Sequence, residues 1–123
     1  MLLKDITALR GPSGWEDEAR NAIRREAEDI LKDKEGRVYG DTMGNLYAYR
    51  KGTDAAKPHV MLAAHMDEVG FIIRFIGEDG LLRFDCVGGV DPRCVVSKRV
   101  IVGEKQVPGV IGVKAIHLMS AAD

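Results

Sequence analysis

The sequence predicts an α/β fold that is followed by a small antiparallel β module. Three observations support this fold class. Apolar residues recur at helical spacing between residues 15 and 31, which is typical of an amphipathic helix. An unbroken apolar run at 60–64 is typical of a strand that is buried on both faces of a sheet. From residue 71 onward, short β-type runs alternate with glycine-containing turns, and no helical period is present.

The N-terminal residues predict two helices. Apolar residues at helical spacing predict a short helix within residues 2–9, which the Gly-Pro pair at 11–12 ends. Ser13 or Gly14 is the predicted N-cap of a second helix over residues 15–31. Because the charged residues of this second helix fall outside its apolar stripe, we expect them to form a solvated face.

Three strands are expected next. Alternating residues predict strands at 37–39 and 46–50, which the turn-forming residues 41–45 connect. A polar loop at 51–58 then leads into the apolar run at 60–64. The order of two helices and three strands suits the beginning of a mixed α/β sheet.

The second half of the chain predicts the β module. Its expected strands lie at 71–76, 81–87, 94–102 and 106–113. Two of these runs contain the two cysteines of the chain, Cys86 and Cys94. The spacing of the two cysteines matches no common zinc site and requires no disulfide, so both are predicted to be small buried hydrophobic residues.

The composition excludes several classes of function. The 123 residues are 46% apolar and 30% charged, with a formal net charge of −1. Without a basic excess, neither nucleic acid nor an anionic membrane surface is expected as a partner. No apolar run approaches the ~18 residues that a membrane span requires, and the N-terminus lacks the features of a signal peptide. We therefore expect a cytoplasmic protein.

The apolar run at 60–64 delivers the main candidate site. His65 and Asp67 follow it directly, and the carboxyl ends of strands are where open α/β sheets bind ligands. A neutral imidazole is a good ligand for Zn or Co, and a carboxylate two residues on projects from the same side of an extended chain. The spacing suggests a metal ligand and the carboxylate that orients it. A histidine at a strand end is also commonly a hydrogen-bonded structural residue.

Other residues with metal-binding side chains are assigned structural roles. His59 lies six residues before His65, ~20 Å away in an extended strand, so the two cannot share a metal within one chain. His117 follows a β run and is expected in a turn or at the surface. Three carboxylates are interpreted as turn or strand-end residues: Asp41, Glu68 and Asp91.

Five short motifs occur in an order that resembles one known family. They are GPSGWE at 11–16, DTMGNL at 41–46, AHMDEVG at 64–70, GGVD at 88–91 and GVIGVK at 109–114. In this order and at these separations they resemble the M42 metallo-aminopeptidases, which include glutamyl aminopeptidases and tetrahedral aminopeptidases. The resemblance covers essentially all 123 residues.

The resemblance implies a domain organisation. Residues 1–67 would be the N-terminal part of a mixed-sheet αβα metallopeptidase catalytic domain, and residues 68–123 part of a small antiparallel β-barrel used for dimerisation. Members of the family are roughly three times this length, so the chain resembles their N-terminal third. A strand at 60–64 would then lack some of its cover, and we expect the chain to associate with copies of itself.

The resemblance also implies a reaction. Family members use two divalent metal ions, Zn or Co, to remove N-terminal residues from peptides. His65 corresponds to a metal ligand, and Asp67 to the catalytic carboxylate that holds this histidine in position. The bridging Asp, the Glu-Glu pair, a further Asp and the final His of the family would lie beyond Asp123. With one imidazole a metal would be held weakly or not at all, so the chain alone is expected to be a poor catalyst or none.

Two other functions are weighed against this one. The chain could act as a non-catalytic module for assembly or binding through its β region. Some family members have carried an endoglucanase name, and glycoside hydrolysis requires two carboxylates ~5 to 9.5 Å apart across a cleft. The sequence singles out no such pair, so this alternative ranks last.

Overall fold

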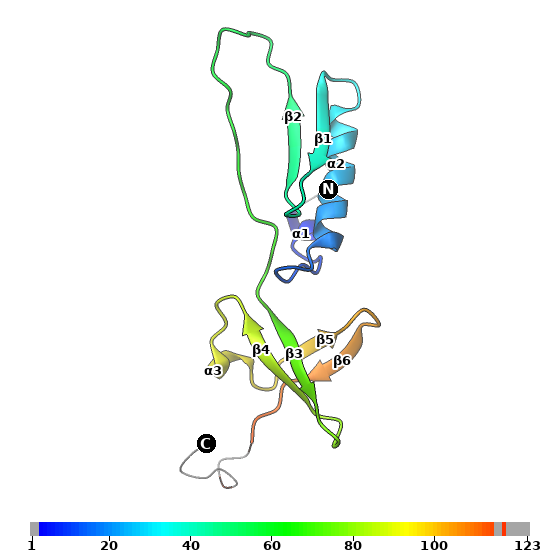
Figure 1. Ribbon diagram of the computed structural model, residues 1–123, viewed down its shortest axis with the longest axis vertical. Coiled ribbons are helices and arrows are strands. Elements are labelled where there is room, and N and C mark those ends of the chain that lie inside the picture. The colour runs from blue at the N-terminus through cyan, green and yellow to red at the C-terminus, as the bar shows by residue number, and fades with distance from the viewer. Residues whose placement is uncertain (1–2, 115–116, 118–123) are drawn as a thin grey trace. The chain divides into compact units, whose positions relative to one another are not determined.

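The computed structural model describes residues 3–114 and 117 of the chain. The chain divides into two compact units, Met1–Gly88 and Gly89–Asp123, and each unit is described by itself. The described residues form α1 (Leu3–Ile6), α2 (Asp17–Leu31), β1 (Gly36–Gly40), β2 (Leu46–Arg50), β3 (Gly70–Ile76), β4 (Leu82–Val87), α3 (Pro92–Val95), β5 (Arg99–Val102) and β6 (Val107–Val110) (Figure 1). Their strands pair into three two-stranded antiparallel sheets. The mixture of helices and strands agrees with the predicted α/β class. The predicted domain boundary after residue 67 stays a prediction.

Helix α2 packs against the hairpin of β1 and β2 (Figure 1). Ala19 and Ala22 are its buried residues, on the stripe that the sequence predicted. The predicted N-cap is wrong, because the helix is capped at Glu16, without a side-chain cap hydrogen bond. Ser13 lies in the turn before the helix, and its hydroxyl donates a hydrogen bond to the Asp67 side chain.

The β1–β2 hairpin is the most regular part of the first unit. Its register runs from Gly36 opposite Arg50 to Gly40 opposite Leu46, and the two strands and the hairpin connection that the sequence predicts are confirmed. A Cβ atom on Gly36 would lie 2.6 Å from the carbonyl oxygen of Tyr49 and 3.0 Å from a methyl carbon of Leu31 in α2. Glycine at this position therefore allows the hairpin to approach the helix closely.

The structure overturns the predicted buried strand at 60–64. This segment belongs to no strand, and Val60, Met61 and Leu62 are 86%, 84% and 93% exposed. Figure 1 shows the chain running from β2 to β3 as a long segment without secondary structure. A strand needs a neighbour to satisfy its backbone groups, and no described strand pairs with this segment. Its apolar sequence therefore lacks a sheet to join within the described residues.

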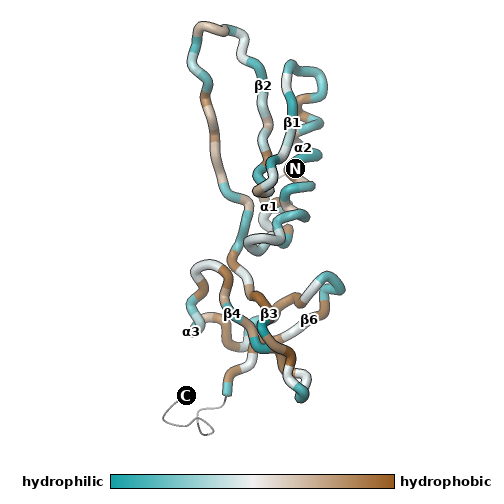
Figure 2. The backbone as a smooth tube through the Cα atoms, in the orientation of Figure 1, coloured by the Kyte–Doolittle hydropathy of each residue, from teal (hydrophilic) through white to brown (hydrophobic). Residues whose placement is uncertain are grey.

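Strands β3 and β4 form the hydrophobic hairpin of the first unit. Gly70 pairs with Val87, Ile76 with Leu82, and the register shifts between Ile73 and Phe75. Figure 2 shows hydrophobic residues concentrated along these two strands. Phe71 and Phe84 make an edge-to-face contact with ring centroids 4.8 Å apart. This agrees with the β-rich sequence that begins at residue 71.

The second unit contains a helix where the sequence predicts a strand, and its last strand, β6, is shorter than the predicted 106–113. Residues 94–102 were expected to form one strand, but α3 occupies the first part of this range and β5 only the last part. The side chain of Asp91 accepts a hydrogen bond of 2.9 Å from the backbone N–H of Arg93, and Pro92 lies in the first turn. A capping aspartate followed by proline favours a helix start, and this local signal determines the structure.

The predicted burial of the cysteines is also wrong. Cys86 in β4 and Cys94 in α3 are both exposed free thiols. A two-stranded sheet and a single helical turn are too small to bury a side chain without a further layer.

Within the described residues, no helix is long and apolar enough to cross a membrane.

Candidate functional site

His65 and Asp67 lie in contact, as their spacing predicted. The ring nitrogen Nδ1 of His65 lies 3.0 Å from Oδ1 of Asp67 and 3.1 Å from the Asp67 backbone oxygen. Both oxygens accept hydrogen bonds, so Nδ1 is the nitrogen that donates, and in the neutral ring Nε2 then keeps its lone pair. The His65 side chain is 86% exposed, whereas Asp67 is 41% exposed. The His65 side chain is thus exposed to solvent, while its Nδ1 is held by the hydrogen bond to Asp67.

The second oxygen of the Asp67 carboxylate is held by Ser13. The Ser13 hydroxyl donates to Oδ2 of Asp67 at 2.5 Å, so each carboxylate oxygen has its own donor. The hydrogen bond from Ser13 is the largest cause that lowers the pKa of Asp67 below its ordinary value, and the bond from His65 acts in the same direction. Asp67 therefore stays a carboxylate, which is the form that accepts both hydrogen bonds.

Glu68 connects the loop of Ser13 to the start of β3. Its backbone N–H donates to the Gly11 carbonyl at 2.8 Å, and the Gly11 N–H donates to Oε1 of Glu68 at 3.1 Å. Pro12 and Glu68 form an isolated parallel β-bridge. These contacts agree with the structural role predicted for Glu68.

His65 and Asp67 line a small open hollow. It has a volume of about 150 Å³ and is lined by Glu16, Met43, Gly44, Asn45, Ala64, His65, Met66 and Asp67. The lining shows that the hairpin turn at 43–45 and the segment at 64–67 lie side by side. The sequence placed these two motifs on separate elements, and the structure brings them to one site.

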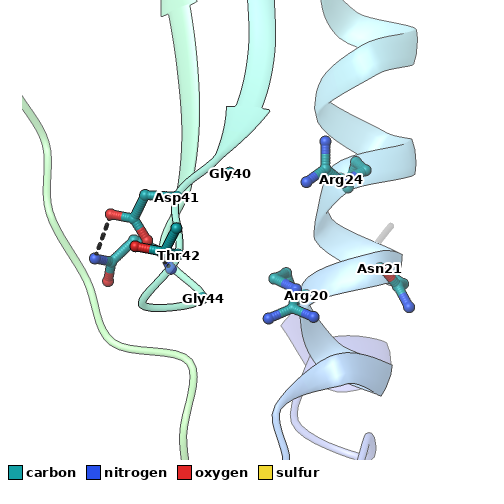
Figure 3. Close-up of a pocket in the computed structure, with 8 residues that line it drawn as sticks. Arg20, Asn21, Arg24, Gly40, Asp41, Thr42 and Gly44 are labelled. Atoms are coloured by element: carbon teal, nitrogen blue, oxygen red, sulfur yellow. Dashed lines mark hydrogen bonds between the residues drawn. The ribbon is translucent and has the colours of Figure 1, made fainter.

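A second hollow lies on the side of the hairpin turn that faces α2. Its volume is about 410 Å³, and it shares Gly44 and Asn45 with the hollow of His65. Figure 3 shows the guanidinium groups of Arg20 and Arg24 pointing from α2 toward the turn. Arg20 pairs with Asp17 of its own helix. The turn that borders the candidate site therefore lies against two half-buried arginines.

Asp41 organises this turn. Its Oδ1 accepts from the backbone N–H groups of Met43 and Asn45, and its Oδ2 accepts from the Asn45 amide and the Tyr47 hydroxyl. The dashed line at Asp41 in Figure 3 marks its side-chain bond of 2.8 Å. These bonds, that of the Asn45 side chain first, lower the pKa of Asp41 below its ordinary value of 3.8. The structural role predicted for Asp41 agrees with this network.

The Asp41 network predicts a pH dependence of the turn. Because its pKa is lower in the folded chain, ionised Asp41 stabilises the turn fully above its ordinary value of 3.8. This contribution is lost as the pH falls through the lowered folded pKa. We expect the amide protons of Met43 and Asn45 to lose protection from hydrogen exchange in this acid range. The Asp41→Asn variant should show weaker protection at neutral pH and no such acid step, and an unchanged acid step in this variant would contradict the assignment.

The other predicted residues lie apart from these contacts. Asp91 caps α3 and also binds the Arg93 guanidinium, so its structural interpretation agrees with the structure. His59 is exposed, with its ring 6.5 Å from that of Tyr49. His117 is exposed, as expected of a surface residue.

The described residues fit one position of a metal site. His65 offers an oriented Nε2, but no group of three or more His, Cys, Asp or Glu side chains could hold a metal in residues 3–114 and 117. A catalytic zinc site usually takes three protein ligands. The described residues therefore offer a single oriented imidazole and do not form a complete metal site.

Ser13 is the site residue that sequence reasoning missed. It was assigned to helix capping because serine before an apolar helical stripe is a frequent cap. The glycines on both sides of the Pro12–Ser13 pair were a signal for a tight turn, but contact with Asp67, 54 positions along the chain, could not be inferred from them.

Comparison with known proteins places these residues in context. The sequence profile of M42 glutamyl aminopeptidases matches residues 44–123. The lysyl aminopeptidase of Pyrococcus furiosus is 38% identical over 125 residues, covering 98% of this chain and 34% of that protein. The matched part of the chain spans between 24% and 34% of the length of the curated relatives.

Solved structures show the same similarity. An endoglucanase from Thermotoga maritima is 41% identical with a TM-score of 0.79, over 93% of this chain and 34% of that one. The TET1 peptidase of Pyrococcus horikoshii, which can assemble into a tetrahedron or a large octahedral shell, is 33% identical with a TM-score of 0.69. That match covers 98% of this chain and 36% of the peptidase.

Proposed function

Because the chain belongs to the M42 peptidase family, we propose that it carries part of the active site of a metal-dependent aminopeptidase. Such a hydrolase removes N-terminal residues from peptides. The observation that carries the proposal is the contact between His65 and Asp67, which leaves Nε2 of the ring exposed and able to bind a cation. A histidine that is oriented through its other nitrogen by a carboxylate is a recurrent arrangement in metal sites.

The roles of the individual residues follow from their contacts. His65 would be one ligand of a divalent ion, and Asp67 would fix the ring and raise its basicity. When bound, such an ion polarises a peptide carbonyl as a Lewis acid. The other metal ligands and the general base are expected from residues other than those described. Zinc or cobalt, a cytoplasmic location and a β region that mediates dimerisation are parts of the same proposal.

Self-association is proposed with the enzyme function. The TET1 peptidase to which the chain is similar assembles into large shells. In the present chain, several apolar side chains of β3 are exposed: Ile72, Ile73, Phe75 and Ile76. A hydrophobic hairpin with this exposure is typical of a surface that another protein surface covers. A homo-oligomer is therefore the expected state in solution.

Two alternative functions are less well supported. A purely non-catalytic assembly module would have no use for the oriented His65 ring. A glycosidase would need a pair of carboxylates free to act on a sugar, and both oxygens of Asp67 are occupied by His65 and Ser13. In a metallopeptidase, these contacts would hold His65 in the orientation that a metal ligand requires.

A chimaeric enzyme tests the proposal. Residues 1–123 of this chain would replace the aligned segment of the Pyrococcus furiosus lysyl aminopeptidase, and hydrolysis of aminoacyl p-nitroanilides would be measured with added Zn or Co. We expect metal-dependent hydrolysis by the chimaera and little or none by the 123-residue chain alone, because the described residues supply one ligand. A chimaera that folds like the relative but does not hydrolyse any substrate would contradict the proposal.

A further inference from the structure

We propose that Ser13 is a positioning residue of this site: its hydroxyl fixes the Asp67 carboxylate, which in turn holds the His65 ring with Nε2 available to a cation. This inference rests on the proposed function, because it assigns Ser13 to the pair that would bind the metal. Ser13 would not touch the metal or the substrate, and it would act only through Asp67.

The first support is the division of the Asp67 carboxylate between two donors. Oδ1 receives the His65 Nδ1–H at 3.0 Å, and Oδ2 receives the Ser13 hydroxyl at 2.5 Å. A carboxylate that is held by one donor can rotate about its last bond at little cost, whereas two donors on its two oxygens fix its plane. Because Asp67 is 41% exposed, packing alone does not restrict this rotation.

The second support is that Ser13 is itself held in place. The backbone N–H of Trp15 donates to the Pro12 carbonyl at 2.8 Å, which closes a turn with Ser13 at its second position. Gly14 at the third position has a φ of 86°, which side-chain-bearing residues rarely adopt. The Gly14 N–H donates to Oε1 of Glu16 at 2.6 Å. The turn thus presents the hydroxyl from a constrained backbone.

The third support is that this turn is attached to the segment that carries Asp67. Gly11, directly before the turn, exchanges hydrogen bonds with Glu68, as described above. A Cβ atom on Gly70 would lie 2.7 Å from Cβ of Pro12, so Pro12 packs directly on the start of β3. The loop at 11–14 is therefore held against the residues that directly follow Asp67 along the chain.

An ordinary structural role for Ser13 does not explain these contacts. The sequence predicts Ser13 as a helix N-cap, but α2 begins at Asp17 and its N-cap is Glu16, without a side-chain cap hydrogen bond. The hydroxyl is instead aimed at a carboxylate 54 positions away, which already binds a histidine. The hydrogen-bond chain runs from Ser13 through Asp67 to Nδ1 of His65.

The chain of hydrogen bonds has a measurable consequence at the His65 ring. A carboxylate at Nδ1 favours the tautomer with hydrogen on Nδ1, whereas a free neutral imidazole favours hydrogen on Nε2. If Ser13 fixes Asp67, removing its hydroxyl should weaken this preference without unfolding the turn. The tautomer of His65 therefore reports on Ser13 even in the absence of metal.

Nitrogen-detected NMR of the 123-residue chain tests this directly. Histidine labelled with ¹⁵N gives the tautomer of each ring at mildly alkaline pH, and a His65→Gln variant identifies the His65 signals among the three histidines. We expect mainly the Nδ1–H tautomer at His65 in the unmodified chain. In Ser13→Ala its population should fall by about half or more, and in Ser13→Thr, which keeps a hydroxyl, it should be retained.

Each other outcome has a defined meaning. An unchanged tautomer in Ser13→Ala would overturn the inference, and so would loss of the preference in both serine variants, because the hydroxyl would then not be the cause. Unchanged amide signals of α2 and β1 would show that the variants are folded. The Asp67→Ala variant removes the carboxylate but keeps the backbone oxygen, which lies 3.1 Å from Nδ1 of His65. An unchanged tautomer in this variant would show that the backbone oxygen and not the carboxylate orients the ring, which would overturn the role proposed for Asp67 as well as that of Ser13. A change in Asp67→Ala without a change in Ser13→Ala would reject Ser13 alone.

Discussion

Substitution of His65 by alanine is expected to lower kcat/KM of the chimaeric aminopeptidase by at least about 100-fold. Loss of a residue that only orients a ligand typically costs ~10 to 100-fold, and loss of the ligand itself should cost no less. We expect this loss because Nε2 of His65 is exposed and would bind the metal ion. Asp67 holds the ring in position through a hydrogen bond from Nδ1. The measurement is steady-state hydrolysis with Zn or Co, together with the metal content of the purified protein.

His59→Ala is the matched control for this prediction. His59 is also exposed and lies six residues before His65, but its ring is near Tyr49 and makes no contact with Asp67 among the interactions of the described residues. Its replacement should leave kcat/KM unchanged within about twofold, since surface substitutions away from a site usually have little effect. Equal losses in both variants would show that the loss is not specific to His65 and would contradict its assignment as a metal ligand.

The second large effect is expected from Asp67→Asn, which should weaken metal binding by ~10 to 100-fold. The substitution keeps the size of the side chain and removes the negative charge that accepts hydrogen bonds from His65 and Ser13. Metal affinity of the chimaera would be measured by competition with a chromophoric chelator. Asp54→Asn, in the loop before the site, is the control, because the Asp54 side chain bonds only its neighbours Ala56 and Lys57 among the interactions of the described residues. Equal affinities in the two variants would remove the role assigned to Asp67.

The elements that sequence predicted well are those whose signals are local. The β1–β2 hairpin needs only alternating residues and the turn chemistry of Asp41, whose side chain accepts from residues two and four positions on. The contact between His65 and Asp67 is also local, because side chains two apart on an extended chain share a side. Such features depend little on the rest of the molecule.

The elements that sequence predicted poorly depend on distant partners. The run at 60–64 has the composition of a buried strand, but it needs neighbouring strands that the described residues do not provide. The predicted burial of Cys86 also requires a partner, namely a second layer packed on β4. The described residues provide no such layer, and Cys86 is exposed. The contact of Ser13 was missed because it also depends on a distant partner. Ser13 reaches Asp67 only because hydrogen bonds between Gly11 and Glu68 hold the two segments together. Contacts between segments this far apart cannot be predicted from the local sequence pattern.

The most direct test of the central claim, that Asp67 prepares His65 for a metal, is a Co²⁺ titration of the chain followed by NMR. The three histidines compete in one sample, and His59 and His117 are both exposed controls without a described carboxylate at the ring. Paramagnetic broadening of the His65 signals should occur at Co²⁺ concentrations about 10-fold lower than for the other two. This advantage should disappear in Asp67→Ala. Equal broadening of all three histidines in the unmodified chain would contradict the claim.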